Sequence, residues 1–195
     1  MLLFTIAVFA SCKENGNLEM QKNGFNSHQV EVTFYELELA PNKGLYYYKE
    51  KPFNGIALSN YQNGAMSEKT TFAKGKKHGK QFKYFEDGTV SFEANYLDGN
   101  REGTTTTFWK NGNKRYKSNF IKGYAAGKQY QWYRGGEKFK EINLVDGKEE
   151  GLQRSWRENG KIYNNYEAKN GRIFGLKRAS LCFQLDDEKL QAYTR

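Results

Sequence analysis

The chain has 195 residues, of which 31 are Lys or Arg and 22 are Asp or Glu, so its formal net charge is +9. Aromatic residues make up 16% of the sequence, which excludes an intrinsically disordered chain, because disordered chains contain few aromatics. No apolar run reaches the roughly 18 residues that a membrane-spanning helix needs. Two Cys and two His are too few for a clustered zinc site, so we expect neither a metal nor a cofactor.

The first ten residues are mostly apolar and too few to span a bilayer. They lead into Phe9-Ala10-Ser11-Cys12, which resembles the lipobox of bacterial lipoproteins, and the following Lys13-Glu14 is similar to the start of some Bacteroidetes lipoproteins. The resemblance implies a signal peptide over residues 1–11, a lipid on Cys12 and a polar tether over residues 12–29. The alternative is a short apolar strand with an incidental cysteine.

Three series of glycines repeat every 24 residues along the body of the chain. A fixed period held over five units indicates a repeat architecture, in which these glycines define the turns. The first series is Gly55, Gly79, Gly103, Gly127, Gly151 and Gly175; the second is Gly64, Gly88, Gly112, Gly136 and Gly160; the third is Gly75, Gly99, Gly123, Gly147 and Gly171.

The residues around these glycines predict hairpins. The second series includes Asn63-Gly64 and Asp87-Gly88, dipeptides that are typical of two-residue type I′ turns. The third series, as in Lys74-Gly75 and Asp98-Gly99, closes the next bend. About eight residues separate successive turns, the usual length of a strand. Each unit is therefore predicted to be two antiparallel strands and two turns.

Side chains alternate along these strands. Phe82 and Tyr84 are expected on one face of the first strand, and Phe92, Ala94 and Tyr96 on one face of the second. Period two with one apolar face indicates a half-buried antiparallel sheet. The predicted fold is all-β, an elongated single-layer antiparallel β-meander of 24-residue hairpin repeats.

Within one unit, the segment from Tyr84 to Gly88, then Tyr96 to Gly99 and on to Gly103, resembles the MORN repeat, in particular the variant of bacterial YwqK-type proteins. The resemblance covers residues 44–178. It implies a non-catalytic repeat module that is linked with membrane association and protein scaffolding. The last unit departs from the pattern, because Arg154 and Arg157 stand where aromatics are usual.

The rest of the chain is assigned around this array. Residues 30–54 are predicted to form N-terminal capping strands, residues 55–178 the repeat array, and residues 179–195 a C-terminal cap. Val30 to Leu39 alternates apolar and polar residues and is expected to cap one end of the sheet. Leu181, Phe183 and Leu185 alternate in the same way and are expected to form a closing strand at the other.

The sequence offers little for catalysis, and we predict no enzyme. His78 is expected to be a solvated turn residue beside Lys76 and Lys77, and Cys182 has no base at useful spacing. The aspartates that precede glycines, such as Asp87 and Asp98, are accounted for as turn formers. No nucleotide-binding, metalloprotease, serine-hydrolase or dithiol motif is present.

Two surfaces are left for binding. Basic residues are interspersed with acidic ones, so a solvated sheet face is favoured over nucleic acid, although a basic face also suits anionic lipid headgroups. The aromatic side chains either curl inward or form an open strip, for which Tyr84, Trp109, Tyr133 and Trp156 are the candidates. Such a strip suits a protein or a glycan and disfavours a small-molecule substrate.

These observations predict a lipid-anchored protein of the bacterial cell envelope that binds an unidentified protein partner or acts as a scaffold. Two alternatives stay open. One is the antitoxin of a toxin–antitoxin pair, a role that the resemblance to YwqK-type proteins implies. The other is a surface protein that binds glycans or lipid headgroups.

Overall fold

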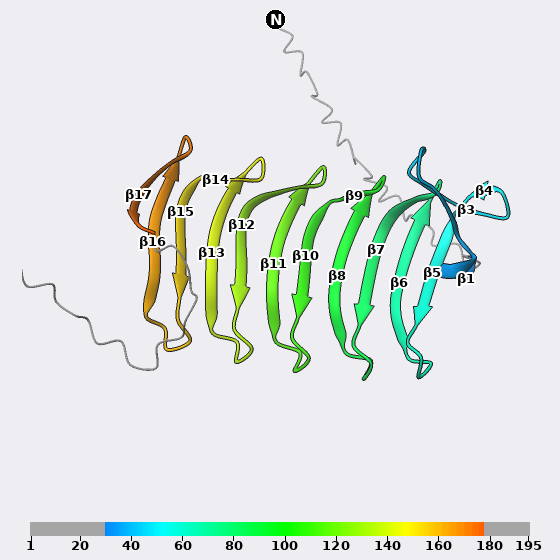
Figure 1. Cartoon of the computed structure of the whole chain (residues 1–195), viewed down its shortest axis with the longest axis horizontal. Coiled ribbons are helices and arrows are strands. Elements are labelled where there is room, and N and C mark those ends of the chain that lie inside the picture. Colours follow the sequence, from blue (N-terminus) through cyan, green and yellow to red (C-terminus); the bar gives the residue numbers. More distant parts are fainter. Residues whose placement is uncertain (1–29, 178–195) are drawn as a thin grey trace, which may run out of the picture.

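A computed structural model of the chain describes residues 30–177. Cys12, the signal peptide and tether assigned to residues 1–29, and the cap assigned to residues 179–195 lie outside the described residues, and they stay predictions. The described part is one fourteen-stranded sheet with a three-stranded sheet at its N-terminal end (Figure 1).

The strands of the large sheet are β1 (Glu31–Thr33), β5 (Gly55–Asn60), β6 (Met66–Ala73), β7 (Lys76–Tyr84), β8 (Val90–Leu97), β9 (Asn100–Arg101), β10 (Gly103–Phe108), β11 (Lys114–Ile121), β12 (Tyr124–Trp132), β13 (Lys138–Val145), β14 (Lys148–Glu149), β15 (Gly151–Trp156), β16 (Ile162–Lys169) and β17 (Arg172–Leu176). The small sheet consists of β2 (Glu38–Ala40), β3 (Leu45–Tyr48) and β4 (Lys51–Pro52), and the 3₁₀ helix η1 (Phe34–Glu36) precedes it.

The predicted fold class is confirmed. From β5 to β17 each hairpin pairs antiparallel with the next, and the hairpins follow one another along the long axis of the molecule as a single curved layer (Figure 1). Residues 30–177 contain no α-helix, and no helix among them is long and apolar enough to cross a membrane.

The N-terminal end departs from the expected alternating strand over Val30 to Leu39. β1 pairs with β5 in parallel, and the chain then leaves the sheet through η1. The break has a local cause: the Glu36 carboxylate accepts hydrogen bonds from the backbone N–H of Thr33, at 2.8 Å, and from the Thr33 hydroxyl. This capping box starts a helical turn where the apolar alternation alone predicts a continuing strand.

The hydrophobic core of the described residues is small and lies at this end. Val32, Leu37, Phe53, Ala57 and Phe72 are buried together, and the rings of Phe34, Tyr46 and Tyr48 pack against them. The three-stranded sheet therefore covers the first hairpin of the array, which has no preceding repeat to pack against.

The two hairpin turns of each repeat are of different types, and the sequence-based assignment of the type I′ turn was wrong. At Asn63-Gly64 only the glycine has positive φ, at 84°, and the Gly64 N–H donates to the Tyr61 carbonyl at 3.0 Å. The strand register shifts at Asn60, so this is a type I turn with a glycine bulge. The type I′ turns belong to the third series, where Asp98 and Gly99 have φ of 50° and 89°. Asn-Gly suits both geometries, because both put glycine in the left-handed region.

The first glycine series marks a bend in the sheet. Thr70 pairs with Gln81, whereas Phe72 pairs with Lys77, so β7 has two extra residues around Gly79. In the next repeat the strand is interrupted at Glu102, between β9 and β10. Beyond the bend, short strands such as β9 and β14 run across the upper edge of the sheet (Figure 1).

The sheet has aromatic side chains on both faces, not on one as predicted. Phe82 pairs with Glu93, and Phe92 pairs with Lys83, so the rings of the two paired strands point to opposite faces. We call the face that carries Phe92, Ala94 and Tyr96 the inner face and the face that carries Phe82 the outer face. On the inner face the bend brings the Arg101 guanidinium to 5.9 Å from the ring centre of Phe92 and 5.1 Å from that of Phe120.

The middle of the inner face is a row of almost completely buried side chains, most of them small or polar, and we call this row the central ladder. Its members come from neighbouring strands except β13, where Ile142 pairs with Gln129 but is only half-buried. They are Ala57, Thr70, Gln81, Ala94, Thr105, Ser118, Gln129, Gln153 and Tyr166.

Candidate functional site

The four aromatic residues predicted as one strip occupy two different positions of the repeat. Tyr84 and Trp156 end strands on the outer face, where Tyr84 stacks on Phe82 with ring centres 6.4 Å apart. Trp109 and Tyr133 come one residue later in their repeats, at the start of a turn. All four side chains are half-buried. The structure thus separates them into two pairs, and their role in binding stays a prediction.

The turn aromatics link neighbouring repeats. The Tyr61 hydroxyl donates to the Tyr84 carbonyl at 2.6 Å, and Trp109 Nε1 donates to the Trp132 carbonyl at 3.1 Å. The Tyr133 hydroxyl donates to the Trp156 carbonyl at 2.9 Å. Each bond spans 23 residues, so these side chains hold one hairpin against the next. The 24-residue spacing of Tyr61, Phe85, Trp109 and Tyr133 is the sequence signal for this role.

Beside these turns lies a shallow hollow of about 550 Å³. Arg115 lies over the ring of Trp109, with its guanidinium 4.6 Å from the ring centre, and it is the only charged residue that lines the hollow. In the next repeat the equivalent pair is Tyr133 and Phe139, whose ring centres are 4.9 Å apart. The aromatic lining consists of Phe85, Phe108, Trp109, Tyr116, Trp132 and Phe139.

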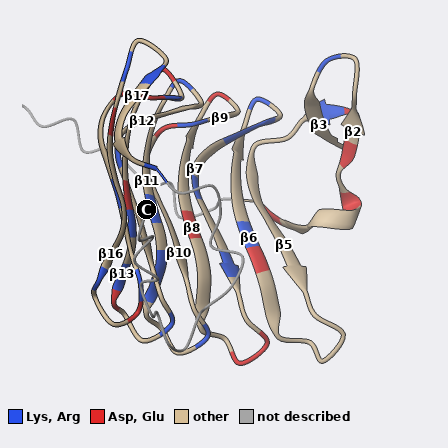
Figure 2. Ribbon diagram, turned by 60° about the vertical axis from the view of Figure 1, so that its left-hand side comes forward, with Lys and Arg blue, Asp and Glu red and all other residues tan. Residues whose placement is uncertain are grey.

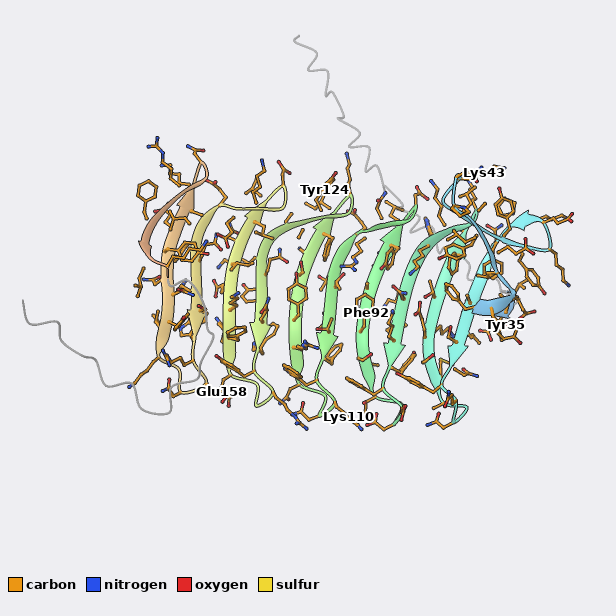
Figure 3. All side chains as sticks on the ribbon, viewed as in Figure 1. Tyr35, Lys43, Phe92, Lys110, Tyr124 and Glu158 are labelled. Atoms are coloured by element: carbon orange, nitrogen blue, oxygen red, sulfur yellow. The ribbon has the colours of Figure 1, made fainter. Side chains whose placement is uncertain are left out.

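A second feature is a row of exposed apolar side chains at the upper hairpin tips. Leu97, Ile121 and Val145 each precede a type I′ turn and are 49%, 57% and 52% exposed. Tyr124, which follows the middle turn, is 68% exposed and lies at the upper edge in Figure 3. Because the tips are two strands apart, successive side chains are separated by about 10 Å. We call these four residues the tip row.

The sequence reasoning missed the tip row. Its signal was an aliphatic residue directly before the third-series dipeptide, as in Leu97-Asp98-Gly99 and Ile121-Lys122-Gly123. In the sequence, such a residue cannot be distinguished from the other apolar residues of the strand. Only the type of the following turn shows that it lies at the exposed tip of a hairpin.

The charged side chains of the outer face are largely paired. Glu141, whose side chain is 12% exposed, lies within 3.3 Å of Lys128, 3.2 Å of Lys138 and 3.9 Å of Arg154. Burial acts to raise the pKa of Glu141, but hydrogen bonds from Lys138 and Lys128 and their positive charges outweigh it and hold the pKa below its usual value. Blue and red segments accordingly occur together on the strands in Figure 2.

The titratable groups considered for catalysis are not brought together. His78 lies in β7, not in a turn, and its Nδ1 is 3.3 Å from Asp98 at the exposed upper edge. Cys182 lies outside the described residues. Over residues 30–177, no cluster of three or more His, Cys, Asp or Glu side chains could hold a metal ion.

The fold defines this protein as a β-hairpin repeat protein. Residues 77–98 and 101–122 match the MORN repeat variant. The first matched segment covers nearly all of β7 and β8, the second covers the end of β9 with β10 and β11, and the neighbouring hairpins have the same turns and bends. Residues 77–122 therefore carry MORN repeats of the variant type. No curated protein matches the sequence.

Proposed function

We propose that the chain is a non-catalytic protein-binding module, held at the bacterial cell envelope by a lipid on Cys12. The observation that carries the proposal is the tip row. Exposed apolar patches that are rimmed by polar residues mark protein interaction sites, and the tip row sets four apolar side chains along one edge of the sheet. Adjacent hairpins present Leu97, Ile121 and Val145 at the same repeat position, on a sheet held rigid by its hydrogen bonds.

The charges beside the tip row favour a protein over other partners. The three turns contain Asp98, Lys122 and Asp146, so anionic and cationic groups alternate along the edge. An anionic membrane or a nucleic acid favours a uniformly basic surface. A protein surface can match alternating charges and apolar side chains together, which gives specificity.

The test is a crosslinking pull-down of the full chain, tagged at its C-terminus, from intact cells. Replacing Leu97, Ile121 and Val145 by Ser should abolish recovery of one stoichiometric protein partner. A matched control replaces Met66, Leu152 and Ile162, which are comparably exposed but lie elsewhere, and it should retain the partner. Equal recovery with both triple variants would contradict the proposal.

The proposed localisation at the cell envelope rests on the apolar first ten residues and on Phe9-Ala10-Ser11-Cys12. Labelling of cells with palmitate should mark the native chain and not the Cys12→Ser variant. If both are labelled equally, the anchor is not on Cys12. If neither is labelled and the recovered partner is a cytosolic toxin, the antitoxin role replaces the envelope role. If only wall material or lipid is recovered, the protein is a surface-binding protein.

A further inference from the structure

We propose that the hollow beside the lower hairpin turns is a binding site for an acidic saccharide, with Arg115 holding its carboxylate and the ring of Phe85 stacking on a sugar ring. This site lies beside the lower turns, away from the tip row on the upper turns, and it is independent of the protein-binding role.

The hollow exists because the side chain at one position of the repeat differs in size between neighbouring repeats. Residue 115 follows the turn of Trp109 and lies over its ring, and Phe139 packs in the same way on Tyr133. In the preceding repeat the equivalent residue is Ser91, which is too small to cover the ring of Phe85. The ring of Phe85 is therefore left facing the hollow.

The charge of the hollow is not balanced by the protein. Among the described residues no carboxylate lies within ion-pair distance of Arg115, whereas Glu141 pairs with three cations elsewhere on the sheet. A guanidinium stacked on an indole ring keeps its in-plane N–H groups available for hydrogen bonds. Two parallel N–H donors match the two oxygens of a carboxylate. The hollow therefore favours an anionic ligand.

Its remaining polar groups suit hydroxyls. The side chains of Ser91, Thr107 and Gln131 line the hollow, and none of them has a hydrogen-bond partner among the described residues. A sugar ring has apolar C–H faces that stack on aromatic rings and hydroxyls at its edge that pair with such groups. An extended peptide is disfavoured, because the strands around the hollow are paired on both sides and leave no edge to which a peptide could add.

The test measures binding of oligosaccharides to the full chain by calorimetry and by the fluorescence of the tryptophans. The probes are tetragalacturonate, a hyaluronan tetrasaccharide and a muramic-acid-containing glycan fragment, with cellotetraose as the neutral comparison. Arg115→Gln removes the cation and retains a polar side chain, and Arg115→Lys restores the charge without the planar fork. Arg134→Gln is the matched control, because Arg134 is exposed at a neighbouring turn and does not line the hollow.

At least one acidic probe should bind more tightly than cellotetraose, and added salt should weaken it. Arg115→Gln should weaken this binding by about tenfold to a hundredfold, the range for a charge-assisted hydrogen-bonded pair. The affinity of Arg115→Lys should lie between those of the native chain and Arg115→Gln. Arg134→Gln should bind the probe as tightly as the native chain does. The inference is overturned if no acidic probe binds, if cellotetraose binds equally well, if Arg115→Gln has no effect, or if hexaglutamate displaces the saccharide at equal concentration. A protein partner recovered in the pull-down would leave each of these outcomes unchanged.

Discussion

Gln153 provides the sharpest test of how this single-layer sheet is stabilised. It belongs to the central ladder, is fully buried, and lies just after the bend at Gly151. Its Oε1 accepts a hydrogen bond from the Asn143 N–H at 2.8 Å. Its Nε2 donates to the Asn143 carbonyl at 2.9 Å and to the Gly151 carbonyl at 3.2 Å. The side chain thus replaces strand-to-strand hydrogen bonds where the bend interrupts them.

Gln153→Met keeps the length of the side chain and removes all of these bonds. A buried polar group that loses its partner costs about 1–3 kcal/mol. Four backbone groups lose their bond to this side chain: the Asn143 N–H and the carbonyls of Asn143, Glu150 and Gly151. The carbonyls of Asn143 and Glu150 each keep another bond, so the cost comes from the Asn143 N–H and the Gly151 carbonyl. We therefore expect the free energy of unfolding to fall by about 2–5 kcal/mol, an appreciable part of the 5–15 kcal/mol that holds an ordinary domain together.

The measurement is urea unfolding followed by tryptophan fluorescence and by circular dichroism. Gln131→Met is the matched control, since Gln131 is half-buried on the same sheet and has no hydrogen bond among the described residues. It should change the free energy of unfolding by less than about 0.5 kcal/mol. The slope of unfolding against urea must stay the same in both variants, because a changed slope would signal loss of two-state behaviour. Equal destabilisation by Gln153→Met and Gln131→Met would refute the role assigned to the central ladder.

Three further predictions concern other contacts of the array. Thr105 takes the ladder position that Gln81, Gln129 and Gln153 hold in other repeats, and its buried hydroxyl has no partner among residues 30–177. Thr105→Gln should raise the free energy of unfolding by about 0.5–1.5 kcal/mol, seen as a higher urea midpoint, and a lower midpoint would show that the bend there has no room for the amide. Tyr133→Phe removes the bond to the Trp156 carbonyl and should cost about 0.5–1.5 kcal/mol without loss of the fold, which circular dichroism would check. The pKa of Glu141 is lower in the folded chain than in the unfolded chain, so its stabilising effect is present above its unfolded pKa and is lost as the pH falls through the folded value. The urea midpoint of Glu141→Gln should therefore vary less than that of the native chain below about pH 5, and identical pH profiles would contradict this.

The repeat period and the fold class could be predicted because glycine has few alternatives at positive φ. Each glycine of the three series has positive φ in the structure, and a side chain at such a position is strained. The spacing of these positions therefore sets where the chain reverses direction. The strands between successive turns are short, and the two-residue turns join them as antiparallel hairpins.

The assignment of the aromatic rings to one face was wrong because the position of the turn sets which residues pair across the two strands. With a turn at Asp87-Gly88, Lys83 pairs with Phe92, and one step further Phe82 pairs with Glu93. Residues that face each other across two strands share a face, so Phe82 and Phe92 point in opposite directions. Counting residues back from the turn on both strands reveals this, whereas alternation within each strand separately does not.

Other features could not be inferred from one sequence. Gln and Thr in alternating strands read as solvent-facing residues, and the central ladder is buried because the bend brings segments such as Arg101 over the inner face. The departure of the chain from the sheet after β1 follows a short capping box, Thr33 with Glu36, inside an otherwise alternating stretch. In both cases contacts between distant segments or a local polar bond outweigh the apolar pattern.

The distribution of stabilising contacts bears on the function. Each hairpin is held by its neighbours through the central ladder and the turn aromatics, and a hydrophobic cluster is present only at the N-terminal end of the described residues. A side chain at the tip of an upper hairpin contributes to none of these contacts. The side chains of Leu97, Ile121 and Val145 form none of the hydrogen bonds that hold the sheet, because they are apolar, and about half of each residue is exposed. Their exposure thus has no structural explanation in the repeat, and a surface that is covered by a partner supplies one.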